Sequence, residues 1–477
     1  MTFFQVDRTQ YPIGQGSFHA TAIRRRGSKL SMVIDCGGAT AAHRAVLIDE
    51  FAQGQRRHDI LAISHFDQDH INGIEELHAA GVSFDSVFLP HAEIRSYLLW
   101  MTLKLSGEEL ADEDIANVIR IGGRLYGGDF GPVVLVGTGS PEQPGERDLG
   151  PDSTNVLRDQ LTDDAFEALK RAREGGQIFS CSQSLNMRNV DWLFRFYSRE
   201  WIYPEEARVI WSLPLFAGLK AVVNQANQKM TQAQWSSFAS ALEVELSRKV
   251  SHADAPQIRK ILGAGLSKTD TRQEPLRRLA HKIRNTPGLS CKEVLTTLYS
   301  LSQSLEDYND ASMCVYSGPA QRGTDTWPEQ FSRTVHQGQR ALRNEKLLLA
   351  HNREVGWITT GDADFSTPEK MKEFLRHYHA ETALTSVFVL PHHGSRNSYD
   401  SNMDRLRELI ANLCDRPLFI APANPEHKKF RHPHWPVEST CRKAGDFYIV
   451  DNDFASYYRE TIKPVRALAE VLSWEWP

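Results

Sequence analysis

Cysteine is scarce in this sequence, and its distribution excludes several kinds of protein. The six cysteines are scattered, and no two of them form a Cys-x-x-Cys pair: Cys36, Cys181, Cys291, Cys314, Cys414 and Cys441. This pattern is typical of reduced thiols in a protein core and not of a disulfide framework or a zinc ribbon. None of the six is a strong candidate for a catalytic nucleophile.

Long apolar runs are also missing. No stretch of 18 or more apolar residues indicates a membrane span, and residues 1–7 lack the basic start and apolar core of a signal peptide. We therefore expect a soluble, cytoplasmic protein with no membrane partner. The net charge is only −5, so any binding of nucleic acid must use local basic patches.

What the chain does have is enough apolar sequence for several strands. Its 477 residues, of which 41% are hydrophobic, suffice for two to three average domains. The β-prone runs 18–23 and 30–34 flank a basic turn and predict a hairpin. Further on, 74–80 has the pattern of a helix and 82–89 that of a strand.

The character of the sequence changes near residue 137. A loop rich in glycine and proline covers 137–145, and helical patterns then dominate to about residue 307, apart from a strand-like run at 190–197. We predict three parts: residues 1–145 and 307–477 as two halves of one fold, and 146–306 as a mostly helical insertion that could recruit a protein partner. A basic cluster there either contacts phosphates or is a solvated helix face: Arg272, Arg277, Arg278, His281, Lys282 and Arg284.

Four potential metal ligands lie within six residues: His65, Asp67, Asp69 and His70. They follow the apolar run 60–63 and precede a plausible helix. At a strand end, side chains at i and i+2 project to one side, so His65 and Asp67 can bind one cation together. Asp69 and His70 can face a second cation about 3.5–4 Å away. A polar loop is the alternative, but this density favours a two-metal site.

Three later polar loops also follow apolar runs. Asp362 follows the run 355–359, His392 and His393 follow 386–390, and His432 and His434 come after 418–420. Such a pattern predicts that one edge of the sheets carries the chemistry. His91 also follows a strand, and either reaches this edge or lies at the surface.

Together these motifs resemble a known family. The His-x-Asp-x-Asp-His segment resembles the metal-binding signature of the metallo-β-lactamase fold, in the variant with Asp where many members have a second His. With the later Thr-Gly-Asp-Ala and His-His-Gly-Ser motifs, the order is most similar to the metallo-β-lactamase-like domain of ComEC-type competence proteins, over about 20–135 and 308–455. The resemblance implies an α+β fold, an αββα sandwich with a large helical insertion. The membrane channel of those proteins is absent, so a transport role is not implied.

The resemblance also implies roles for single residues. Asp362 would bridge two divalent cations, Zn²⁺ or Mn²⁺ with Mg²⁺ possible, and either His392 or His393 would supply the last imidazole. Asp35, in an early Asp-x-Gly, would support the metal loop without binding metal. The predicted metal ligands are therefore His65, Asp67, Asp69, His70, Asp362 and one or both of His392 and His393.

Two such cations would activate a water molecule and neutralise a developing oxyanion, which suits phosphodiesters well. His434 or His432 could protonate the leaving oxygen, and we take both, with Asp69, as candidate catalytic residues. The loop carrying them could instead be an ordinary surface turn. The predicted substrate-binding residues are Asn309, Ser312, Ser395, Lys428, Lys429 and Arg431.

We expect a metal-dependent phosphodiesterase or nuclease that acts on nucleic acid, with DNA favoured, in DNA processing or in defence against foreign DNA. The same fold supports other chemistry. The alternatives are hydrolysis of a small ester, a lactone or a head-group phosphodiester, and a partner-binding regulatory module.

Overall fold

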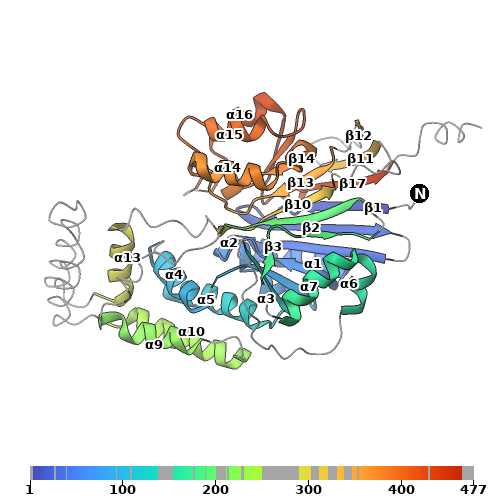
Figure 1. Ribbon diagram of the computed structural model, residues 1–477. Coiled ribbons are helices and arrows are strands. Elements are labelled where there is room, and N and C mark those ends of the chain that lie inside the picture. Colours follow the sequence, from blue (N-terminus) through green and yellow to red (C-terminus); the bar gives the residue numbers. More distant parts are fainter. Residues whose placement is uncertain are drawn as a thin grey trace, which may run out of the picture. The chain divides into compact units, whose positions relative to one another are not determined.

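The computed structural model describes residues 4–25, 28–38, 40–92, 94–107, 110–137, 154–175, 178–188, 190–199, 211, 214–226, 230–249, 289–301, 311–320, 330–337, 346–351, 354–427 and 430–464. Over these ranges the protein is an α+β structure with two mixed sheets (Figure 1). The chain divides into two compact units, one from residues 1–91, 130–200 and 308–477 and the other from 92–129 and 201–307.

The first unit contains both sheets. Within the described ranges, sheet 1 has ten strands in the spatial order β12 (Lys346–His351), β11 (Gln330–Gln337), β17 (Tyr458–Pro464), β1 (Phe4–Gln10), β2 (Gly16–Arg25), β3 (Ser28–Gly38), β4 (Arg57–Ala62), β5 (Ser83–Pro90), β6 (Val133–Gly137) and β7 (Phe179–Ser180). Sheet 2 has seven, in the order β16 (Asp446–Val450), β15 (Leu418–Pro422), β14 (Thr385–Val389), β13 (Gly356–Thr359), β10 (Cys314–Pro319), β9 (Trp192–Tyr197) and β8 (Ser184–Asn186). Strands β3 to β7 run parallel, as do β13 to β16.

The two sheets share one core, because each presents alternate apolar side chains to the other. On β1, Phe4 is buried while Gln5 faces the opposite way. Phe4 meets Trp192 of sheet 2 edge to face at 6.2 Å, and Phe88 stacks on Phe196 at 4.9 Å. All five residues of β14 are buried, as expected for a parallel strand covered on both faces.

Helices cover the outer faces of the sheets (Figure 1). On sheet 2, Phe374 of α14 and Val437 of α16 pack in one cluster with Phe388. On sheet 1, Phe51 of α1 meets Phe18 of β2 edge to face at 5.1 Å. The helices of this unit are α1 (Ala41–Gly54), α2 (Gln68–Ile71), α3 (Ile74–Ala79), α6 (Thr154–Gln160), α7 (Asp163–Gly175), α14 (Pro368–His377), α15 (Asp404–Ile410) and α16 (Trp435–Ala444), with short 3-10 turns η3 (Thr382–Leu384), η4 (Pro391–Gly394), η5 (Arg396–Ser398) and η6 (Phe454–Ser456).

The second unit is helical in its described residues. A capping box between Thr231 and Gln234 starts α10, whose Trp235 lies over Gly123 of α5, where a Cβ would lie 2.2 Å from the indole. The elements are α4 (Ile94–Gly107), α5 (Asp112–Gly127), η1 (Pro214–Phe216), α9 (Ala217–Gln225), α10 (Gln232–Ser247) and α13 (Cys291–Leu301).

Most of the predicted elements are confirmed. The runs 18–23 and 30–34 form the antiparallel pair β2 and β3, and 82–89 and 190–197 are β5 and β9. All six cysteines are buried and free. In the described ranges, no helix combines the length and apolar character needed to cross a membrane.

The helical unit has other bounds than the predicted insertion at 146–306. The segment 179–197 contributes β7, β8 and β9 to the two sheets, so it belongs with the first unit. Conversely, the helical segment 92–129 belongs with the second unit. Hydrophobic spacing shows that a segment is helical but not which unit it packs in.

Candidate metal centre

The predicted ligands come together where parallel strands of both sheets end. Asp35 lies near the end of β3, and His65 to His70 follow β4 in sheet 1. Asp362 follows β13, and His393 follows β14 in sheet 2. The carboxyl ends of parallel strands are where α/β proteins commonly bind ligands.

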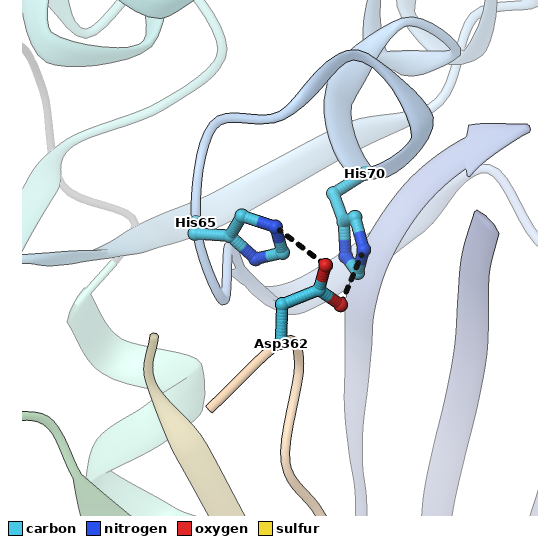
Figure 2. Close-up of side chains that lie close together, drawn as sticks. All are labelled: His65, His70 and Asp362. Carbon is cyan, nitrogen blue, oxygen red and sulfur yellow. Dashed lines mark ion pairs between the residues drawn. The ribbon is translucent and has the colours of Figure 1, made fainter. Parts of the chain in front are cut away.

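Asp362 lies between two imidazoles (Figure 2). Its Oδ2 is 3.6 Å from Nε2 of His65, and its Oδ1 is 3.2 Å from Nε2 of His70. All three side chains are buried, and one ligand atom from each lies within 4.8 Å of the other two. This spacing is small enough for one cation to contact all three.

A second group of possible ligands adjoins the first. It consists of Asp69, His70 and His393, whose ligand atoms also lie within 4.8 Å of one another. Nε2 of His393 is 3.0 Å from Oδ2 of Asp69 and 3.9 Å from Oδ1 of Asp362. His70 thus belongs to both groups, and Asp362 faces both.

The Nδ1 atoms of these three imidazoles have polar partners of their own. Nδ1 of His70 lies 2.9 Å from Oδ2 of Asp35. Ser64 donates its hydroxyl to the same oxygen at 2.7 Å and lies 3.0 Å from Nδ1 of His65. Nδ1 of His393 donates to the carbonyl of Pro422 at 2.8 Å. An Nδ1 that donates leaves Nε2 with its lone pair, which is the form that binds metal.

The atoms that face one another in the centre are buried and unpaired. Nε2 of His65, His70 and His393 and Oδ1 of Asp362 have no hydrogen-bond partner of acceptable geometry. Buried polar atoms are nearly always paired, so four such atoms at one place call for a ligand. Imidazole nitrogens and carboxylate oxygens together suit Zn²⁺ and Mn²⁺, and the residues present therefore fit the predicted cations.

The electrostatics also favour positive charge here. Burial and His70 lower the pKa of His65, but Asp362 and Asp67 outweigh them and raise it to about 9. The pKa of Asp362 lies well below its usual range, because four imidazoles outweigh the effect of burial. The carboxylate stays ionised, and its field attracts a cation.

Backbone strain is concentrated around these residues. Asp35, His392, His393 and Arg431 have positive φ angles of 49–57°. This left-handed region costs a non-glycine residue roughly 1–2 kcal/mol. Strained residues cluster at functional sites, because there the surrounding structure holds a side chain in a particular direction.

Two glycines let the loops approach closely. A Cβ at Gly37 would lie 2.5 Å from the backbone nitrogen of His70. A Cβ at Gly361, where φ is +52°, would lie 2.6 Å from the Cβ of Ser64. Both belong to motifs recognised in the sequence, and their missing side chains make room for the ligand loop.

Two other predicted ligands, Asp67 and His392, lie beside the groups. Oδ2 of Asp67 is 3.6 Å from Nε2 of His65. His392, at 32% side-chain exposure, places Nε2 3.9 Å from Asp362, whereas His393 is only 2% exposed and joins the second group. The geometry therefore favours His393 as the ligand. His91 packs beside Gly137 and belongs to neither group.

The His432 loop lies beside the second group. The ring of His432 lies 6.1 Å from that of His393 and 4.7 Å from that of His434. Burial, followed by the neighbouring imidazoles, lowers the pKa of His432 to about 3, and burial and Arg396 lower that of His434. A general acid works best with a pKa near the operating pH, so His434, the less buried of the two rings, is the better placed to donate a proton.

The predicted substrate-binding residues have different surroundings. The hydroxyl oxygen of Ser312 is buried and unpaired, and Arg431 is exposed. The hydroxyl of Ser395 accepts a hydrogen bond from the Asn397 nitrogen and caps η5, which gives it a local structural role. Asn309, Lys428, Lys429 and the basic cluster within 272–284 lie outside the described residues.

Sequence reasoning missed two supporting residues. Ser64 connects Asp35 to His65, and Nε2 of Gln15 lies 3.4 Å from Nδ1 of His432. Gln15 could have been noticed in the sequence, because it lies between two glycines. Ser64 had none beyond its place before His65.

No model of a protein family matches this sequence, and no curated protein matches it. Function is therefore inferred from the geometry and chemistry of the site.

Proposed function

We propose that this protein is a metal-dependent phosphodiesterase that binds two divalent cations and hydrolyses nucleic acid, with DNA as the favoured substrate. One observation carries the proposal. The two oxygens of Asp362 face different pairs of imidazoles: Oδ2 faces His65 and His392, and Oδ1 faces His70 and His393. A carboxylate that bridges two cations needs this arrangement.

We also infer that the two sheets form the αββα sandwich of the metallo-β-lactamase fold. The shared core between the sheets, the helices on their outer faces and the order of the sequence motifs support this.

In this proposal, His65 and Asp67 would hold one cation, Asp69, His70 and His393 would hold the other, and Asp362 would contribute one oxygen to each. Zn²⁺ or Mn²⁺ fits the donor set, and Mg²⁺ is possible. When bound, the cations lower the pKa of a water molecule and offset charge on a phosphoryl oxygen. Asp35 and Ser64 keep the imidazoles directed at the centre, and His432 presents a neutral ring beside His393.

The surroundings of the centre favour an anionic substrate. The exposed guanidinium groups of Arg396 and Arg431 are on the two loops that carry His393 and His432. Arginine at such a position recognises phosphate oxygens.

The test combines metal analysis with a substrate panel. Purified protein is assayed with Zn²⁺, Mn²⁺ or Mg²⁺ on a chromogenic phosphodiester, plasmid, single-stranded DNA, RNA, a small ester and a lactone. Asp362→Asn should lose bound metal and phosphodiesterase activity. Asp364→Asn is the matched control, because Asp364 pairs with Ser366 and Lys370 and belongs to neither ligand group.

Full turnover by Asp362→Asn would refute the bridging role. Activity confined to the ester or lactone would refute the phosphodiesterase proposal but leave the metal centre standing. Absence of metal and of all activity in the native protein would favour a binding or regulatory module.

A further inference from the structure

The loop that carries His432 and His434 also exposes two aromatic side chains. Phe430 is 38% exposed and Trp435 is 71% exposed, and both belong to the small set of large hydrophobic residues exposed in the described ranges. Exposed aromatic rings next to a catalytic centre commonly mark a binding surface. These two lie within a few residues of the imidazoles beside the metal centre.

Phe430 belongs to a row of nearly parallel rings that leads to the centre. His427 stacks on Phe430 at 5.0 Å and 19°. Phe430 stacks on His432 at 5.8 Å and 30°, and His432 on His393 at 6.1 Å and 20°. A single imidazole therefore separates the exposed ring of Phe430 from a proposed metal ligand. Within this row, His427 and His432 cover the two faces of the Phe430 ring, so the exposed part of Phe430 is its edge.

Positive charge alternates with these rings. Arg431 follows Phe430, and Arg396 lies on the facing loop, where its backbone nitrogen donates to Nδ1 of His434 at 3.0 Å. Both arginines are exposed, and in the part of the chain that the structure describes neither forms an ion pair. Their guanidinium groups are available to anions. We call Phe430, Arg431, Trp435 and Arg396 the aromatic patch.

We propose that the aromatic patch binds single-stranded nucleic acid, with an unpaired base stacked on Trp435, a neighbouring base against the exposed edge of Phe430, and phosphates near Arg396 and Arg431. This inference rests on the proposed function, because it specifies the strand state of that substrate. Aromatic rings interleaved with basic groups are how proteins bind unpaired strands. In a duplex the faces of the bases are covered by their neighbours, so only the arginines would find partners.

The binding test uses the full-length chain and a short, labelled oligothymidine, with EDTA present so that no metal-dependent cleavage intervenes. Trp435→Leu should weaken binding on the order of 5- to 100-fold, and Phe430→Leu, which removes only an edge contact, should weaken it by a smaller factor. Trp435→Phe and Phe430→Tyr keep a ring and should bind close to the native level. An abasic oligomer of the same charge is the matched ligand control. It should bind more weakly than oligothymidine and equally well to the native chain and the leucine variants.

Native affinity of Trp435→Leu and Phe430→Leu for oligothymidine would overturn the proposal. So would an equal loss of abasic and oligothymidine binding, or tighter binding of a duplex that is insensitive to both substitutions. Circular dichroism checks that the variants fold. This outcome can be told apart from that of the proposed function. Binding of oligothymidine in EDTA involves no hydrolysis, and hydrolysis of a chromogenic diester by the native protein involves no nucleobase.

Discussion

Asp35 binds no cation in the proposed centre, yet its contacts direct two of the imidazoles that do. It accepts hydrogen bonds from the backbone and hydroxyl of Ser64, both at 2.7 Å, and from Nδ1 of His70 at 2.9 Å. Its backbone is held at a φ of +56°. The carboxylate thus sets both the direction and the basicity of the ligands.

Replacement of Asp35 by Asn should therefore weaken metal binding while preserving the fold. The amide keeps the size of the side chain but loses the charge that faces His70, and loss of such a partner typically costs 10- to 100-fold in metal affinity. Titration calorimetry with Zn²⁺ and Mn²⁺ measures the effect. Asp59→Asn is the control, because Asp59 is also buried and accepts two hydrogen bonds from Ser31. Equal affinities in the two variants would contradict the role of Asp35.

His434 is the better candidate for assisting the leaving group, because His432 is the more deeply buried ring. We expect His434→Ala to slow DNA cleavage on the order of 10²-fold or more, while hydrolysis of a p-nitrophenyl diester changes little, because p-nitrophenolate departs without a proton. His432→Ala should show a smaller selective loss. Rates on both substrates and metal content provide the measurement. A uniform loss with metal depletion would make the residue a ligand, and no loss would make the loop an ordinary surface turn.

Sequence identified most of the candidate centre at this scale, because His65, Asp67, Asp69 and His70 are close in the chain and follow a strand. The sequence could not show which of His392 and His393 is the metal ligand. Both have left-handed backbone conformations, and only the surrounding loops, with the Pro422 carbonyl, determine which ring turns inward. Ser64 was missed for a related reason, since its role depends on a partner on another strand.

At the scale of elements, a buried charge cluster connects the sheets. Glu460 of β17 pairs with Arg8 of β1 at 2.8 Å and with Arg333 of β11 at 2.6 Å. The guanidinium of Arg8 also donates to the carbonyl oxygens of Ser317 and Val355. Ser317 belongs to β10 and Val355 directly precedes β13, both strands of sheet 2. The cluster thus fixes the register of three strands and links them to the second sheet.

Glu460→Gln should destabilise the protein strongly, because it leaves two buried guanidinium groups without their carboxylate. Removing one partner of a buried pair costs about 3–5 kcal/mol. Urea unfolding measures the change in the free energy of unfolding. Glu438→Gln is the control, since Glu438 pairs with the exposed Arg442 on α16, and it should cost less than about 1 kcal/mol. A loss in Glu460→Gln no larger than in this control would show that the cluster is dispensable.

Elements with a strong local pattern were predictable, including β2, β3, β5, β9, β14 and α3. The extent of the helical unit was not. An amphipathic helix such as α7 presents an apolar stripe whether it covers a sheet or another helix. Which one it covers depends on contacts between residues far apart in the sequence.

At the scale of the whole first unit, His19 lies between the sheets and makes folding sensitive to acid. Its ring lies 4.7 Å from that of Trp357 on sheet 2. Burial, and then the charge of Arg8, lower its pKa to about 3. The unfolded chain therefore takes up a proton on this residue near pH 6.5, whereas the folded chain does not.

The stabilisation that depends on neutral His19 is complete above pH 6.5 and is lost as the pH falls toward 3. We expect the stability difference between the native chain and His19→Gln to shrink by about 1.4 kcal/mol per pH unit below 6.5. Urea unfolding of both proteins between about pH 7.5 and about pH 5 gives this difference. The titrations of all other groups are common to the two proteins and cancel in the difference. A difference that stays constant or grows on acidification would show that His19 is not held neutral.

The pairing of β1 with β17 has a consequence for synthesis of the chain. Arg459 of β17 bonds to Thr9 of β1 across 450 positions, and Glu460 neutralises the buried Arg8. At roughly 5–20 residues per second, β1 is made roughly 20 to 90 s before its partner. During that interval one edge of β1 has unpaired backbone groups and an arginine without its carboxylate. Until β17 is made, this edge of β1 is open to pairing with a neighbouring chain.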